Sequence, residues 1–207
     1  MYTSSHFKEI DIQEFINLIG SNPLGAIVWQ SANGITADHV PLFYKNNKLI
    51  GHIAKANPIG KENITSPVLV IFQGADSYIS PNWYPTKQEN HKAVPTWNYA
   101  AVHIHGHISF ITENKDKLKI LKELTEIHEA TQEKPWSIVD APADYIEKMM
   151  NGITGIEITI SKIEGKWKVS QNQPSKNKSG IVENLQKFPS GNSEKMIQYI
   201  KKRDSSL

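Results

Sequence analysis

The chain has 207 residues, carries 23 Lys and Arg against 21 Asp and Glu, and has no cysteine. The missing cysteine excludes disulfides, thiolate metal sites, iron–sulfur clusters and thiol nucleophiles. A hydrophobic fraction of 39% is sufficient for a real core at this length. No apolar run approaches the roughly 20 residues of a membrane helix, and the first residues lack a signal-peptide pattern. We therefore expect a cytoplasmic protein that does not enter a membrane.

Positive charge is concentrated towards the C-terminal end. Ten basic and three acidic residues lie between Lys162 and Arg203. Such a basic end on a slightly acidic body can mark a surface for a polyanion such as DNA, or it can be a solvated lysine-rich face. Arg203 is the only arginine, so bidentate arginine recognition of guanine is almost excluded. A phosphate bound to the body must be held by lysines, hydroxyls or backbone N–H groups.

The first predicted element is a helix that begins after Asp11. Asp11 can cap this helix, and Glu14 follows three residues later as in a capping box. Apolar residues then recur at the spacing of one helical face, up to Ile19. Gly20 and Pro23 end the helix.

Strands separated by short turns follow the helix. Residues 24–31, 35–44 and 48–54 have the pattern of strands, and the turns between them are Ala-Asn-Gly and Lys-Asn-Asn-Lys. Residues 67–74 form a strand so apolar that both faces must be covered, and residues 76–80 can extend it. Residues 81–93 are predicted to be a polar loop with two prolines.

The second half mixes long strands with helices. A long strand is predicted from Val94 to Phe110, bent at Gly106, and helices are predicted over 114–130 and 140–152. Residues 153–172 resemble a hairpin with a tight Glu164–Gly165 turn, and one or two polar helices follow over 174–207. Turns of a few residues cannot form parallel crossovers, which need about a dozen residues. The sequence therefore predicts an antiparallel barrel with peripheral helices.

The strand over 94–110 places His103, His105 and His107 on one face, because side chains alternate along a strand. Two imidazoles at this spacing can reach one metal ion. A catalytic zinc usually has a third protein ligand, and no acidic residue on this strand supplies it. We therefore interpret the histidines as packing or hydrogen-bonding groups and predict no metal site.

Common catalytic and nucleotide-binding motifs are missing from the sequence. There is no G-x-S-x-G elbow, no G-x-G-x-x-G dinucleotide fingerprint and no P-loop. Aromatic residues flank the 81–93 loop at Trp83, Tyr84, Trp97 and Tyr99. Together with the neighbouring asparagines, these aromatic residues could bind a planar heterocyclic ligand or a partner protein. They could equally be ordinary packing residues beside the core.

Five blocks of sequence together resemble the PaiB-like family of FMN-binding negative transcriptional regulators. The blocks are ADHVP (37–41), GHIAKANP (51–58), VLVIFQGADSYISPNWY (68–84), VPTWNYAAVHIHG (94–106) and KVSQN (168–172). Their order and spacing fit the family, and the resemblance covers about residues 1–190. It implies a mainly β fold with peripheral helices: an antiparallel split β-barrel of the flavin-reductase and pyridoxamine-phosphate-oxidase kind. It also implies a homodimer with two flavin sites at the subunit interface.

The resemblance further implies FMN as the cofactor of an FMN-binding domain over residues 1–173, with a basic helical extension over 174–207 packed on the same domain. Candidates for the phosphate and ribityl chain are His52, Lys55, Asn57 and Lys61; a dianionic phosphate needs such charge-assisted donors. The strand before them would contribute Thr36, Asp38 and His39. The long strand would contribute Trp97, Asn98 and His103, and the last block would contribute Ser170, Gln171 and Asn172, from the second subunit in one arrangement.

Two positions depart from the family pattern. Asp38 stands where a small hydroxyl residue is commoner, and Gln173 stands where a basic residue is usual. A carboxylate at position 38 would be unfavourable beside a phosphate.

The resemblance implies a repressor rather than an enzyme, with DNA contacts through the basic C-terminal region, although no helix-turn-helix is visible. Two alternatives stay open. One is an FMN-dependent oxidoreductase that uses a reduced nicotinamide. The other is a haem-binding split-barrel protein with His103 or His128 as axial ligand.

Overall fold

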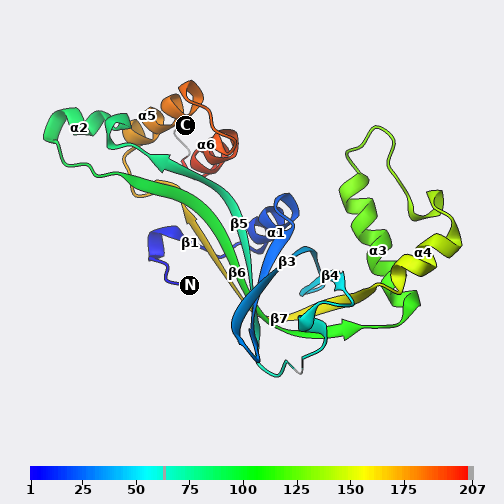
Figure 1. Cartoon of the computed structure of the whole chain (residues 1–207). Coiled ribbons are helices and arrows are strands. Elements are labelled where there is room, and N and C mark those ends of the chain that lie inside the picture. Colours follow the sequence, from blue (N-terminus) through cyan, green and yellow to red (C-terminus); the bar gives the residue numbers. More distant parts are fainter. Residues whose placement is uncertain (63, 205–207) are drawn as a thin grey trace. The chain divides into compact units, whose positions relative to one another are not determined.

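The computed structural model describes residues 1–62 and 64–204. Its strands form one seven-stranded sheet in the order β1-β7-β4-β3-β2-β5-β6, and an additional pairing of β7 with β6 closes this order on itself (Figure 1). The strand pairs are antiparallel. The sequence prediction of an antiparallel barrel with helices attached is therefore confirmed. No helix of the described residues is long and apolar enough to cross a membrane.

A meander of three strands follows the first helix. It consists of β2 (Leu24–Ser31), β3 (Gly34–Lys45) and β4 (Lys48–Ala54), close to the predicted ranges. Asn46 and Asn47 have φ values of 49° and 59°, and this left-handed conformation matches a two-residue hairpin turn to the twist of its strands. Asparagine tolerates the conformation better than most residues.

Three longer strands complete the sheet: β5 (Val68–Ile79), β6 (Thr96–Ile111) and β7 (Ile153–Lys168). The predicted hairpin turn at Glu164–Gly165 is wrong, because β7 continues through it. Gly165 pairs with Glu9 of the short strand β1 (Lys8–Glu9). A Cβ on Gly165 would stand 2.1 Å from the ring of Phe15, so this glycine makes room for packing and does not form a turn.

Gly106 serves the closure of the barrel. The strand β6 runs unbroken through this residue. A Cβ on Gly106 would lie 2.5 Å from the backbone oxygen of Thr159 and 2.7 Å from Cγ2 of Ile158, both on β7. The glycine therefore allows β6 and β7 to approach closely.

Two compact units can be distinguished, and the three long strands each run through both. The first unit contains Met1–Leu18, Gln73–Val102 and the chain from Glu164 onward; the second contains Ile19–Phe72 and His103–Ile163. In the first unit the indole of Trp167 is fully buried. It packs against the rings of Phe15 and Tyr199, at centroid distances of 6.1 and 6.3 Å.

The helices of the first unit are α1 (Ile12–Ser21), of which residues 12–18 belong to this unit, α2 (Pro85–Asn90), α5 (Ser175–Lys187) and α6 (Ser193–Lys202). Helices α2, α5 and α6 lie together in Figure 1. Single 3₁₀ turns lie at η1 (Ser5–Phe7) and η3 (Pro81–Trp83). The predicted loop over 81–93 thus contains a short helix, which starts at Pro85, a residue preorganised for a first helical position.

In the second unit, helices α3 (Asn114–Glu129) and α4 (Ala143–Met150) lie beside each other (Figure 1). Ile120 and Leu124 of α3 pack against Phe43 of β3. The buried ammonium of Lys117 donates a 2.7 Å hydrogen bond to the backbone oxygen of Met150 and so links the two helices. The 3₁₀ turns of this unit are η2 (Pro58–Gly60) and η4 (Ile138–Asp140).

Candidate functional site

The carboxylate of Asp38 is the centre of a polar network in the second unit. Its Oδ2 accepts a 2.8 Å hydrogen bond from Nε1 of Trp29, and its Oδ1 accepts one of 2.8 Å from Nδ2 of Asn57. The Oδ1 of Asn57 in turn accepts from the backbone N–H of Ile59, 3.0 Å away, and caps η2. The predicted site residues Asp38 and Asn57 are therefore hydrogen-bonded to each other. They fix the segment after β4 against β2 and β3.

A recess of about 390 Å³ adjoins this network. Thr36 and Asp38 line it from β3, Trp29 lines it from β2, and Pro58 and Glu62 line it from the η2 segment. The carboxylate of Glu62 accepts a 2.9 Å hydrogen bond from the backbone N–H of Ala32. This hydrogen bond links the β2–β3 turn to the segment after η2, and the recess lies between them.

His52 supplies an unpartnered polar atom in the same unit. Its Nδ1 is buried and has no hydrogen-bond partner among the described residues. Burial lowers the pKa of this imidazole below its ordinary value of 6.5, so the ring is neutral at pH 7. Buried polar atoms are usually satisfied, and one that is not needs an explanation such as an unseen ligand.

Two lysines flank η2. The backbone N–H of Lys55 donates to the carbonyl of Gly152 at 2.8 Å, and that of Lys61 donates to the carbonyl of Pro58 at 2.9 Å. Their backbones are thus held while their side chains are exposed, and neither ammonium has an ion-pair partner within residues 1–62 and 64–204. The two ammonium groups beside η2 and the hydroxyl of Thr36 are groups of the kind that hold the phosphate and ribityl chain of FMN. His52 lies on the other face of β4, because its neighbour Ile53 is the residue that meets Gly60 of η2.

A second group of predicted residues meets in the first unit. Asn98 is buried, and its amide exchanges hydrogen bonds with the hydroxyl of Ser170, at 2.9 and 3.2 Å. Ser170 has φ 66°, a left-handed conformation that is uncommon for a residue with a side chain. Burial raises the pKa of the neighbouring Tyr84, with a partly opposing hydrogen bond to Ser170. Such strain and pKa shifts concentrate at functional sites.

A recess of about 310 Å³ opens beside this pair, lined by Asn98, Ser170, Asn172 and Lys168 among others. The Nζ of Lys168 donates to the backbone oxygen of Trp97 at 2.7 Å and to the hydroxyl of Thr96. Burial, together with the charge of Lys166, lowers the pKa of Lys168. The recess can therefore hold an acceptor-bearing group against a lysine that is partly desolvated.

The remaining predicted residues are dispersed. Gln171 accepts a 2.8 Å bond from the backbone N–H of Val169 and donates to the carbonyl of Trp167, so it holds its own turn. Trp97 points away from Asn98, as adjacent strand residues do, and meets the ring of Tyr78 edge-on at 6.0 Å. His39 is exposed on β3, and His103 is half-buried on β6. Within the described part of the chain, no three metal-ligating side chains gather.

Several residues of these two recesses were missed from the sequence. Trp29 lies opposite Thr36 in the register of β2 and β3, so its place beside Asp38 follows from the pairing of that hairpin. Lys168 lies inside the KVSQN block and was not singled out. Asn177, whose amide donates to the Thr86 hydroxyl at 2.9 Å, gave no signal because the two residues come from separate helices.

The barrel is similar to several solved structures. A conserved hypothetical protein from Mycobacterium tuberculosis aligns with a TM-score of 0.60 at 11% identity, over 84% of this chain and 94% of that one. The flavocytochrome Anf3 from Azotobacter vinelandii aligns with a TM-score of 0.59 at 12% identity, over 78% and 69%. These similarities define the fold as a split β-barrel, as predicted.

The sequence comparisons identify the family. Residues 1–162 match the family described as "Putative FMN-binding domain". The "Protease synthase and sporulation protein PAI 2" of Bacillus subtilis is 31% identical over 205 residues, which cover 96% of this chain and 95% of that protein. The chain belongs to the PaiB-like FMN-binding family, and the predicted family is confirmed.

Proposed function

We propose that this protein binds FMN as a homodimer and acts as a negative transcriptional regulator. The observation that carries the proposal is the pair of exposed lysines that flank η2, Lys55 and Lys61, whose ammonium groups have no ion-pair partner among the described residues. We assign the FMN phosphate to the two lysines and the ribityl chain to Thr36. When bound, the flavin supplies the capacity to accept and donate electrons.

We give the two polar networks different roles in this site. Asp38 and Asn57 satisfy each other, so they position the η2 segment and do not contact the phosphate. This arrangement accounts for a carboxylate at position 38, because its charge is already engaged by two donors. In a homodimer, the family resemblance implies that Ser170 and Asn172 beside the second recess would serve the flavin of the partner.

The basic C-terminal region offers fewer charges to DNA than its composition suggests. Lys178 pairs with Asp204, Lys202 with Glu14, and Arg203 with both Glu9 and Glu14. Lys187 and Lys201 have no ion-pair partner among the described residues. We therefore place the DNA contacts on these exposed lysines.

The FMN half of the proposal is tested by titrating purified protein with FMN and recording the visible spectrum. A saturable spectral change at one FMN per chain is expected, and a double Lys55→Gln, Lys61→Gln variant should bind more weakly. Lys122→Gln on α3 is the control, because it also removes a lysine charge but lies outside the proposed site. Failure of the wild type to bind, or equal binding by the double variant, would contradict the proposal.

The DNA half is tested by gel shifts with the region upstream of the protein's own gene. Binding should weaken steeply with salt, because lysine contacts to phosphates release counterions. A double Lys187→Gln, Lys201→Gln variant should lower the slope of log K against log salt by about 2 for each subunit that contacts the DNA. No shift at about 50 mM salt, the low end at which such contacts are strongest, would contradict direct binding of this DNA through the two lysines.

An FMN-dependent oxidoreductase is the second candidate function. It is favoured by the fold shared with a flavocytochrome, whose name also keeps the haem-binding alternative open. A flavin-loaded protein that bleaches under nitrogen with a reduced nicotinamide would favour the oxidoreductase. A Soret band on haem titration that is lost in a His103→Ala variant would favour haem binding.

A further inference from the structure

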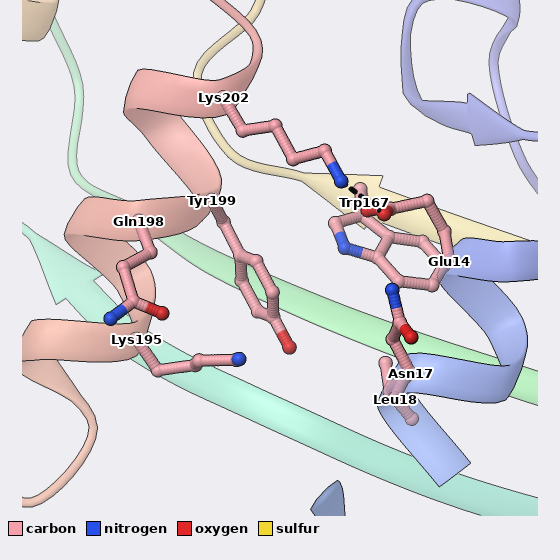
Figure 2. Close-up of a pocket in the computed structure, with 8 residues that line it drawn as sticks. All are labelled: Glu14, Asn17, Leu18, Trp167, Lys195, Gln198, Tyr199 and Lys202. Atoms are coloured by element: carbon pink, nitrogen blue, oxygen red, sulfur yellow. Dashed lines mark hydrogen bonds and ion pairs between the residues drawn. The ribbon is translucent and has the colours of Figure 1, made fainter. Parts of the chain in front are cut away.

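A second, separate pocket lies in the first unit between α1 and α6. It has a volume of about 220 Å³, and Trp167 forms part of its wall. Figure 2 shows Asn17 on α1, and Lys195 and Tyr199 on α6, with their polar ends in the same space as the indole of Trp167. None of these residues belongs to the proposed FMN site. Moreover, α6 and Trp167 lie outside the residues 1–162 that match the family.

Two buried hydrogen-bond donors at this pocket are unsatisfied. The side chains of Trp167 and Tyr199 are 1% and 7% exposed, and neither the indole Nε1 nor the phenol oxygen has a hydrogen-bond partner among the described residues. An unsatisfied buried donor costs about 1–3 kcal/mol. The two rings pack edge-on against each other, with a centroid distance of 6.3 Å and an interplanar angle of 72°, so they are not free to turn towards other partners.

Among the charged groups of the pocket, Lys195 is the cation that forms no ion pair with a carboxylate of the described residues. The carboxylate of Glu14 is bound by Lys202 and, at 3.1 Å, by Nη2 of Arg203. Burial alone would raise the pKa of Glu14, but the hydrogen bonds from these two cations outweigh it and lower the pKa, so the carboxylate is ionised. The ammonium of Lys195 lies 5.6 Å from the centre of the Tyr199 ring and has no carboxylate partner within the described residues.

Three groups that can donate therefore remain at the pocket: an indole N–H, a phenol O–H and an ammonium. Gln198 also lines the pocket with an amide that can donate or accept, and the carboxylate of Glu14 is neutralised by Lys202 and Arg203. A complementary ligand must present acceptors, and a carboxylate has two oxygens with about four acceptor positions. It could accept from Trp167 and Tyr199 while pairing with Lys195. Leu18, which also lines the pocket, offers an apolar contact to the rest of the ligand. The volume is below the roughly 300 Å³ at which sites for drug-sized ligands begin.

We propose that this pocket is a binding site for a small organic carboxylate, distinct from the FMN site. Binding at α6 would place an effector on the C-terminal helices, which carry the exposed lysine Lys201. The site does not depend on FMN, so it can be tested in protein with or without flavin.

The test follows the indole N–H resonance of Trp167 in ¹⁵N-labelled protein during titration with benzoate, and with benzamide as the uncharged match. The chain has five tryptophans, and the resonance is assigned as the one missing from a Trp167→Phe variant. Benzoate should shift this resonance saturably in the millimolar range, and benzamide should not. Tyr199→Phe and Lys195→Gln should each weaken benzoate binding about tenfold, which corresponds to about 1.4 kcal/mol.

Lys201→Gln removes the same charge from the same helix outside the pocket and should leave benzoate binding unchanged. The proposal is overturned if benzoate causes no shift, if benzamide shifts the resonance equally, or if Lys201→Gln weakens binding as much as Lys195→Gln. A pocket that holds only water would give the first of these results.

Discussion

The ion pair between Lys178 and Asp204 allows a quantitative test of how the basic C-terminal region is used. The Nζ of Lys178 lies 2.7 Å from Oδ2 of Asp204, and the two side chains are only 10% and 7% exposed. A Lys178→Met variant would remove one partner of this buried pair, which typically costs 3–5 kcal/mol. A matched control exists two residues away on α5, because Lys176 and Glu89 form a 2.6 Å pair with side chains that are 50% and 58% exposed. Lys176→Met should therefore cost at most about 1 kcal/mol.

The assay is urea unfolding at pH 7, followed by indole fluorescence at one fixed protein concentration, since the stability of the proposed homodimer would depend on concentration. Lys178→Met should lower the midpoint far more than Lys176→Met. A double Lys178→Met, Asp204→Leu variant should recover most of the loss, because an apolar pair often replaces a buried ion pair at little cost. An equal loss of stability in the two single variants, or no recovery of stability in the double variant, would refute the claim that Lys178 stabilises the fold and does not contact DNA.

Three further predictions concern the second unit. Asp38→Asn should destabilise the protein by about 1.5–3 kcal/mol and weaken FMN binding, because two donors lose a charged acceptor; a calorimetric scan and an FMN titration both unchanged would exclude the positioning role. Gly106→Ala should cost at least about 1–3 kcal/mol in urea unfolding, since its Cβ would meet β7 at 2.5 Å, and a neutral result would contradict the close approach of the strands. Burial lowers the pKa of folded His52 below 6.5, so its contribution to stability is full above that pH and is lost as the pH falls towards the folded pKa. The fall in unfolding free energy between pH 7.5 and 5.5 should be shallower in His52→Gln, and identical slopes would exclude His52 as its source.

Local patterns predicted the elements whose contacts are close in sequence. The meander β2–β3–β4 follows from alternation and two short turns, and α1 follows from its apolar face and from Asp11, whose Oδ1 accepts the backbone N–H of Gln13 at 2.9 Å. The predicted capping role of Glu14 is wrong, because its carboxylate binds Lys202 and Arg203 instead. That contact joins residues nearly two hundred positions apart, which no local pattern indicates.

Contacts between residues distant in sequence also explain why some features of the two candidate sites were not predicted. Trp97 and Asn98 were grouped as neighbours in sequence, but a strand sends them to opposite faces, and only Asn98 reaches Ser170. The extra charge of the C-terminal region suggested a free basic surface, whereas the partners of Lys178 and Lys202 become visible only in three dimensions. Gly165 looked like a turn residue because the ring of Phe15 that requires it lies far away in the sequence.

The central claim, that Lys55 and Lys61 hold the phosphate of FMN, is tested most directly by comparing FMN with riboflavin, which lacks the phosphate. Calorimetric titration of the wild type should show FMN binding about 100-fold tighter than riboflavin, a preference of about 2.7 kcal/mol. The double Lys55→Gln, Lys61→Gln variant should lose most of that preference while its affinity for riboflavin is unchanged. A wild type that binds both flavins equally, or a double variant that keeps the full preference, would contradict the claim.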